Sequence, residues 1–144
     1  MANPQSSITN PQSSERWDVL VIDDEPVVCD AVRRVLGAEG LRVATASDGV
    51  TGLGHAAAAT CRLVLLDLML PDRSGFEVLR AFRAWWPDLP VVVITGYATH
   101  ESARRAMEEG AADYLPKPFE ESELLAVVRR ALGDRAGVPE EERA

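Results

Sequence analysis

The regular alternation of short apolar runs with amphipathic segments is the feature that most limits how this chain can fold. Apolar runs of strand length, each followed by a segment with helical spacing, occur at positions 19–22, 41–46, 63–66, 91–94 and 114–115. The third and fourth runs, LVLL and VVVI, are continuously apolar, as parallel strands are when helices cover both faces of their sheet. The pattern predicts a doubly wound α/β fold built from five βα units.

Residues typical of helix ends support this reading. Pro26 marks the start of the first helix, and Gly37 marks its end. The stretch SGFE at 74–77 has the residue types of a capping box. In that motif the Ser74 hydroxyl and the Glu77 carboxylate each accept a hydrogen bond from a backbone amide left free at the helix start. A helix is therefore predicted to begin directly after Ser74.

Both ends of the chain are poor in apolar residues. The first 15 residues contain NPQSS twice, and the last stretch reads GDRAGVPEEERA. Neither segment can bury enough apolar surface to order itself. With 144 residues in all, we predict one domain over 16–133, between a disordered N-terminal tail, 1–15, and a disordered C-terminal tail, 134–144.

The charge of the chain narrows its range of partners. Its formal net charge is −8, whereas a nucleic-acid-binding surface needs clustered Lys and Arg, so we expect no direct contact with nucleic acid. No apolar run approaches the roughly 20 residues of a membrane span, and the N-terminus lacks a signal-peptide pattern. We therefore expect a cytoplasmic protein without membrane contact.

Five polar residues follow the predicted strands at their carboxyl ends. Asp23 and Asp24 follow the first strand, Asp67 the third, Thr95 the fourth and Lys117 the fifth. The carboxyl ends of parallel strands share one edge of the sheet, where α/β proteins bind ligands. Each residue alone has an ordinary explanation as a cap, a strand residue or a surface charge. Because one topology brings all five together, they indicate a site.

The chemistry of these side chains points to phosphoryl transfer. Close carboxylates repel one another unless a cation joins them, and an all-oxygen group with open positions suits Mg²⁺ and phosphate oxygens. Asp67 is the best candidate for a nucleophile, because its strand delivers it to the centre of the cluster. Lys117 is the only lysine of the chain, and its compact ammonium suits a phosphoryl oxygen better than a planar guanidinium would. Thr95 can donate its hydroxyl to another oxygen.

Four stretches of the sequence carry a family resemblance. They are VIDDEP, VLLDLMLPDRSGFEVL, VVVITGYA and GAADYLPKPF. Together they resemble the receiver domain of bacterial two-component response regulators, of the CheY-like superfamily, over residues 17–132. The resemblance implies a flavodoxin-like sandwich with strand order 2-1-3-4-5 and a cis bond between Lys117 and Pro118.

The same resemblance assigns roles to seven residues. It implies that Asp67 is the phosphoacceptor and that Mg²⁺ is held by Asp23, Asp24, Asp67 and the backbone carbonyl of Met69. The switch hydroxyl, the switch aromatic and the phosphate-binding lysine of the family fall on Thr95, Tyr114 and Lys117.

The resemblance also implies partners. A sensor histidine kinase or a phosphotransfer protein would donate the phosphoryl group, so the chain is expected to be a signalling domain and not an enzyme with a separate substrate. It would catalyse only its own phosphorylation and the hydrolysis of its own acyl phosphate. A downstream effector would bind the outer face of the fourth helix, fifth strand and fifth helix, and phosphorylation could produce a homodimer. A stand-alone receiver is expected, with a piece of a longer regulator as the other possibility.

Two other functions stay open at this point. One is a metal-dependent phosphohydrolase with an Asp nucleophile, of the haloacid-dehalogenase-like kind. Such enzymes need the nucleophile and a second Asp two residues later at the end of the first strand, whereas here the first strand ends in adjacent aspartates. The other is a receiver-like adaptor that signals without phosphorylation, which the intact acidic cluster argues against.

Overall fold

Five strands and five helices alternate along the part of the chain that the structure describes. The structure is a computed structural model, and it describes residues 16–133, so both predicted tails lie outside the described residues. The elements are, in order, β1 (Arg16–Ile22), α2 (Pro26–Gly37), β2 (Val43–Ala46), α3 (Gly49–Ala58), β3 (Thr60–Asp67), α4 (Gly75–Trp85), β4 (Val91–Thr95), α5 (His100–Glu108), β5 (Asp113–Pro116) and α6 (Glu121–Ala131).

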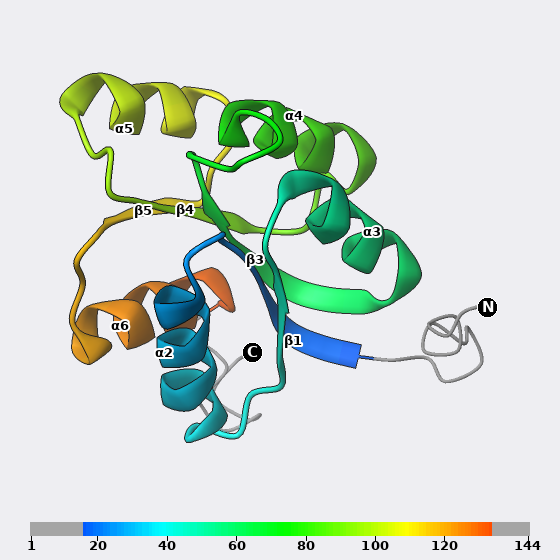
Figure 1. The fold of residues 1–144 in the computed structure, drawn as a ribbon, viewed down its shortest axis with the longest axis vertical. Helices are drawn as coiled ribbons and strands as arrows, with labels where there is room; N and C mark the ends of the chain where they lie inside the picture. Colours follow the sequence, from blue (N-terminus) through cyan, green and yellow to red (C-terminus); the bar gives the residue numbers. More distant parts are fainter. Residues whose placement is uncertain (1–15, 134–144) are drawn as a thin grey trace.

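The strands form one parallel sheet in the order β2-β1-β3-β4-β5. The predicted fold class and strand order are thereby confirmed. In Figure 1, α2 and α6 cover one face of the sheet, and α3, α4 and α5 cover the other. Because side chains alternate across a strand, Val19 and Val21 of β1 pack into the core under α2 and α6. Leu20 and Ile22 of the same strand pack into the opposite core.

Several strand boundaries differ from the sequence prediction, those of β1 and β2 among them. β1 starts at Arg16, three residues earlier than its apolar run, because Arg16 pairs with Thr60 of β3. β2 starts at Val43 and not at 41. The Leu41 amide donates to the Leu36 carbonyl at 3.1 Å, so this residue closes α2 and does not join the sheet. Hydrophobicity alone does not distinguish these two uses of a leucine.

The helix caps agree only in part with prediction. α4 begins after Ser74 as expected, but the Ser74 hydroxyl accepts from the Phe76 amide at 3.1 Å. The structure shows this single bond in place of the predicted reciprocal pair with Glu77. Reciprocal capping boxes occur instead at α5, between Thr99 and Ser102, and at the start of α6. The α4 cap is therefore simpler than its sequence indicated.

Gly75 lets the start of α4 pack directly on the end of β3. Its amide donates to the Leu68 carbonyl at 2.8 Å. A Cβ at this position would lie 2.3 Å from the carbonyl oxygen of Asp67 and 2.5 Å from Cα of Leu68. Both are backbone atoms that cannot turn away as a flexible side chain would. The close approach therefore requires glycine, and it fixes the backbone that carries Asp67.

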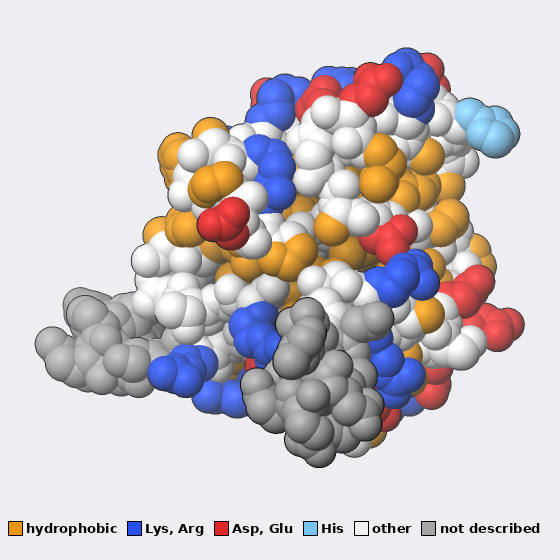
Figure 2. Space-filling model, turned by 180° about the vertical axis from the view of Figure 1, so that it is seen from behind, with side chains coloured by type: hydrophobic (Ala, Val, Ile, Leu, Met, Phe, Trp, Pro, Cys, Tyr) orange, Lys and Arg blue, Asp and Glu red, His pale blue; other side chains and the backbone are white. Residues whose placement is uncertain are grey.

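Surface arginines of α5 are paired with carboxylates. Arg104 contacts Glu101 and lies 2.7 Å from Glu108, and Arg105 lies 3.0 Å from Glu109. Figure 2 shows basic and acidic side chains intermixed along the upper edge of the molecule. Among residues 16–133, no helix combines the length and the apolar character needed to cross a membrane.

Replacing Gly75 by alanine is expected to destabilise the fold. Gly75→Ala should lower the free energy of unfolding by about 1–3 kcal/mol, because the new methyl group overpacks two backbone segments. Gly54→Ala is the matched control, since a Cβ at Gly54 meets nothing within 4 Å. That variant should gain about 0.5–1 kcal/mol from helix propensity. Urea denaturation of both variants measures the difference, and equal stabilities would contradict the role given to Gly75.

Candidate functional site

The carboxyl ends of three parallel strands bring three of the predicted side chains into contact. Asp67 is the last residue of β3, Asp23 follows β1, and Lys117 follows β5. The ammonium nitrogen of Lys117 lies 2.8 Å from Oδ2 of Asp23 and 3.0 Å from Oδ2 of Asp67. The bond between Lys117 and Pro118 is cis, as the resemblance implied. The predicted meeting of these side chains at one sheet edge is confirmed.

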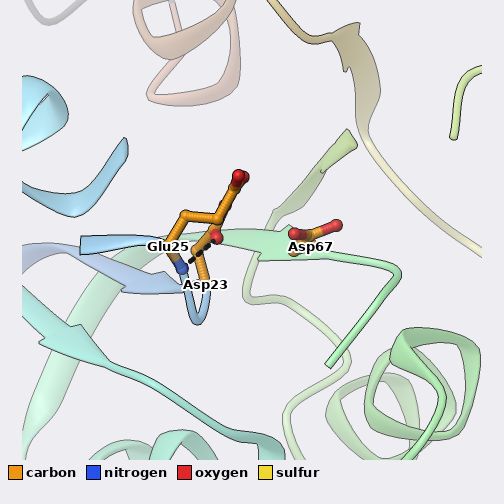
Figure 3. A group of neighbouring side chains, drawn as sticks. All are labelled: Asp23, Glu25 and Asp67. Atoms are coloured by element: carbon orange, nitrogen blue, oxygen red, sulfur yellow. Dashed lines mark hydrogen bonds between the residues drawn. The ribbon is translucent and has the colours of Figure 1, made fainter. Parts of the chain in front are cut away.

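The third carboxylate at this ammonium belongs to Glu25 and not to Asp24. Oε1 of Glu25 lies 2.5 Å from Nζ of Lys117. Carboxylate oxygens of Asp23, Glu25 and Asp67 all lie within 4.8 Å of one another, and Figure 3 shows the three side chains gathered at the ends of β1 and β3. Asp24 is exposed and, together with Asp23, lines a hollow beside the start of α2. Sequence analysis therefore missed Glu25, although the third acid of DDEP was the available signal.

The site combines buried carboxylates with one compensating cation. Asp23 and Asp67 are only 1% and 3% exposed. Burial raises the pKa of Asp23, although the ion pair with Lys117 and the hydrogen bond from the Glu25 amide oppose this. Burial also works against the charge of Lys117, but its contacts with the three carboxylates outweigh this effect and raise the pKa of Lys117. The lysine therefore stays protonated and neutralises part of the negative charge.

The donor set fits a hard divalent cation. Oδ2 of Asp23 is buried without a hydrogen-bond partner, because its 2.8 Å contact with Lys117 is an ion pair outside hydrogen-bonding geometry. A buried polar atom without a hydrogen-bond partner is consistent with a further partner such as an ion, and oxygen ligands are what Mg²⁺ prefers. The Met69 amide donates to Oδ1 of Asp67 at 3.1 Å, and the Met69 side chain is exposed. This hydrogen bond orients the Asp67 carboxylate toward the carboxylates of Asp23 and Glu25.

A chain of hydrogen bonds leads from the sheet edge to α5. Thr95 is buried at the end of β4, and its hydroxyl oxygen accepts from the Tyr97 amide at 3.1 Å. The Ser102 hydroxyl lies 3.0 Å from the Tyr97 carbonyl and 2.7 Å from the Tyr114 hydroxyl, and it also accepts from the Thr99 amide. Either hydroxyl can donate in the bond between Ser102 and Tyr114. Sequence analysis did not identify Ser102.

A hollow of about 500 Å³ opens beside the carboxylates. Its walls include Glu25, Val27, Gly96, Lys117 and Phe119. A Cβ at Gly96 would meet nothing within 4 Å, so the space next to Thr95 is open. The hollow gives a second molecule a route toward the ammonium of Lys117.

Together, the fold and this acidic site define a receiver domain of two-component signalling. The chain belongs to the response regulator receiver domain family, whose model matches residues 19–129. It is 40% identical over 120 residues to the probable transcriptional regulatory protein TcrX of Mycobacterium tuberculosis, an alignment that covers 83% of this chain and 51% of TcrX. This chain thus spans about half the length of that relative.

Solved receiver structures show the same fold. The receiver domain of NtrX from Brucella abortus is 38% identical, with a TM-score of 0.76, over 80% of this chain and 98% of that domain. The BeF3-activated receiver domain of DrrB is 35% identical, with a TM-score of 0.74, over 82% of this chain and 98% of that domain. The region that the family model matches, 19–129, contains all the site residues described above.

Neutralising Asp23 is expected to stabilise the metal-free chain at neutral pH. The folded chain holds this carboxylate ionised where burial favours its neutral form, so Asp23→Asn removes an unfavourable charge. Since the pKa of Asp23 is raised, the gain should be largest above that pKa and should vanish as the pH falls below the ordinary value of 3.8.

Urea denaturation in the presence of a chelator measures this effect. Asp30→Asn is the control, because Asp30 is exposed and its ion pair with Arg33 is long at 3.8 Å. An exposed pair of this kind contributes about 0–1 kcal/mol to the free energy of unfolding. Added Mg²⁺ should stabilise the wild-type chain more than Asp23→Asn. A variant less stable than the wild type at neutral pH would contradict the prediction.

Proposed function

We propose that Asp67 accepts a phosphoryl group from a phosphohistidine of a sensor histidine kinase or a phosphotransfer protein. The observation that carries this proposal is the buried Asp67 carboxylate at the end of β3, 3.0 Å from the Lys117 ammonium. A carboxylate oxygen of Asp67 attacks phosphorus, the phosphorus–nitrogen bond breaks, and its electron pair remains on the imidazole. The product is an acyl phosphate on Asp67, the only substrate that this chain is proposed to hydrolyse.

The side chains around Asp67 support the transfer. Lys117 binds one phosphoryl oxygen, and the Thr95 hydroxyl binds another once the group is attached. Asp23, Asp24, Asp67 and the Met69 carbonyl are the proposed Mg²⁺ ligands; Asp23 and Asp67 already have their oxygens in the acidic group, whereas the Asp24 side chain lies beside it. When bound, Mg²⁺ supplies positive charge that offsets the charge of the phosphoryl oxygens.

Phosphorylation is proposed to act on α5, β5 and α6. When Thr95 moves toward the new phosphoryl group, Tyr114 turns inward and leaves Ser102, so the bonds at the start of α5 change. Such coupling between a site and a distant face is typically about 1–3 kcal/mol. It is enough to change the affinity for an effector protein bound at this face, or to favour a homodimer.

The remaining parts of the proposal concern the protein as a whole. We infer that residues 16–133 are the receiver domain, and that it works in the cytoplasm, where a histidine kinase would phosphorylate it. TcrX is a probable transcriptional regulatory protein in which the matching region is about half of the chain. A stand-alone receiver and the receiver part of a longer regulator would use the same site, so the proposed chemistry holds for both.

Loss of the Asp67 carboxylate is expected to abolish phosphorylation. Wild-type chain incubated with acetyl phosphate and Mg²⁺ should gain one phosphoryl group, as measured by intact-protein mass spectrometry, and Asp67→Asn should gain none, because an amide is a poor nucleophile. Asp88→Asn is the control, since Asp88 is exposed at the opposite end of the sheet. Undiminished labelling of Asp67→Asn would remove the assignment. Sustained turnover of small phosphomonoesters by the wild type would indicate a phosphohydrolase.

Removing the Ser102 hydroxyl is expected to favour the inward conformation of Tyr114 in the unphosphorylated chain. A lost hydrogen bond of about 1 kcal/mol would raise the population of inward Tyr114 roughly fivefold in Ser102→Ala. Fluorotyrosine labelling and fluorine NMR measure this population, because the chain has only two tyrosines and Tyr97→Phe assigns the signals. Ser122→Ala, which removes an exposed hydroxyl from α6, should leave the Tyr114 signal unchanged. An unchanged signal in Ser102→Ala would contradict the proposed link.

A further inference from the structure

The Glu25 carboxylate is the most exposed of the charged groups that contact Lys117. The Glu25 side chain is 54% exposed, that of Lys117 is 12% exposed, and that of Asp67 is 5% exposed. The three groups therefore lie in order from the solvent to the interior. Glu25 and Lys117 also line the hollow that leads to the site. A phosphoryl donor that enters through this hollow meets the Glu25–Lys117 pair before it meets Asp67.

The Glu25 side chain contacts Lys117, although Glu25 stands at the N-cap position of a helix. It is the N-cap residue of α2, but its carboxylate makes no cap hydrogen bond. Its backbone is held in place, because its amide donates to Oδ1 of Asp23 at 2.9 Å. The carboxylate reaches Nζ of Lys117 at 2.5 Å instead. The strongest contact of Glu25 is therefore made with the site and not with its own helix.

The contact with Glu25 takes up one of the hydrogen-bond donors of the Lys117 ammonium. An ammonium has three N–H groups, and three carboxylates surround Lys117, with hydrogen bonds to Glu25 and Asp67 and an ion pair to Asp23. Asp23 and Asp67 are buried and fixed at strand ends, whereas Glu25 is the exposed partner that can leave. An anionic oxygen of Glu25 thus stands where an incoming phosphoryl oxygen would bind the ammonium.

We propose that Glu25 is a positioning residue that holds Lys117 in the unphosphorylated chain and competes with the phosphoryl group for its ammonium. Release of Glu25 is required before Lys117 can bind a phosphoryl oxygen, so Glu25 lowers the rate and the extent of phosphorylation. This inference rests on the proposed phosphorylation of Asp67. It concerns a residue outside the seven whose roles the family resemblance implied.

Two substitutions separate this role from simple charge repulsion. Glu25→Gln removes the charge and weakens the contact with Lys117. Glu25→Asp keeps the charge, but its shorter side chain favours the N-cap position, where aspartate bonds the free amides of the helix. Both variants should therefore release Lys117. Glu39→Gln is the control, because it removes a carboxylate from an exposed pair with Arg129 at the far end of α2.

The first measurement is the rate of labelling by acetyl phosphate at subsaturating concentration with Mg²⁺. Both Glu25 variants should label about three- to tenfold faster than wild type, as expected for the loss of one partly exposed ion pair, and Glu39→Gln should match wild type. Faster labelling of Glu25→Gln alone would overturn the proposal in favour of charge repulsion. Unchanged or slower labelling of both variants would also overturn it.

The second measurement is Mg²⁺ affinity by calorimetry without a phosphoryl donor. The carboxylate of Glu25 lies close enough to Asp23 and Asp67 to share a cation with them, so a role as a metal ligand is the main competing explanation. The proposal expects both Glu25 variants to bind Mg²⁺ within about twofold of wild type. A loss of about tenfold or more, the usual effect of disturbing a metal site, would assign Glu25 to the metal and overturn the proposal.

The third measurement observes the contact directly and needs no phosphorylation. Because Lys117 is the only lysine, isotope-labelled lysine gives one side-chain NMR signal. Both Glu25 variants should shift this signal in the metal-free chain, and Glu39→Gln should not; an unmoved signal would show that the contact is absent in solution. Failure of the wild type to label with acetyl phosphate would refute the proposed function, whereas equal labelling of wild type and Glu25 variants would refute only this inference.

Discussion

The ammonium of Lys117 among three carboxylates is the interaction on which the site depends. Asp23 and Asp67 are buried, and without a cation their charges would repel each other where water screens them poorly. The sheet supplies that cation by its register. Thr95 pairs with Pro116, and the Lys117 amide donates to the Thr95 carbonyl at 2.9 Å. Strand pairing thus places the lysine one residue beyond β5, directly over the carboxylates.

Topology explains how much of the site the sequence could predict. Asp23, Asp67 and Lys117 lie far apart in the chain, yet their meeting followed from the ends of parallel strands, which share one edge whatever the loops do. Glu25 could not be assigned in the same way. Once a strand has ended, backbone rotation over two or three residues decides which of several adjacent acids faces inward. Strand and helix periodicity carries no information about that rotation.

Contacts made by single hydroxyl groups were equally beyond sequence reasoning. The fold class followed from apolar periodicity, which averages over many residues, and the strand order was implied by the family resemblance. The bonds of Ser102 to Thr99 and Tyr114 depend instead on one rotamer and one proton. Ser74 illustrates the same limit, since SGFE has the composition of a capping box, but the Ser74 hydroxyl accepts from the Phe76 amide and the reciprocal pair with Glu77 does not form. Local motifs of this kind specify possible partners and not the partner that is used.

The central position of β3 affects which parts of this domain can unfold locally. β3 is paired on both sides, with β1 and β4, and its last five residues are buried, whereas β5 is a four-residue strand at the sheet margin. Amide hydrogens of β3 should exchange with solvent only when the whole domain unfolds, and those of β5 through small local openings. The Asp67 carboxylate is thus anchored on a strand that is paired on both sides, whereas Tyr114 lies on a strand that is paired on one side only.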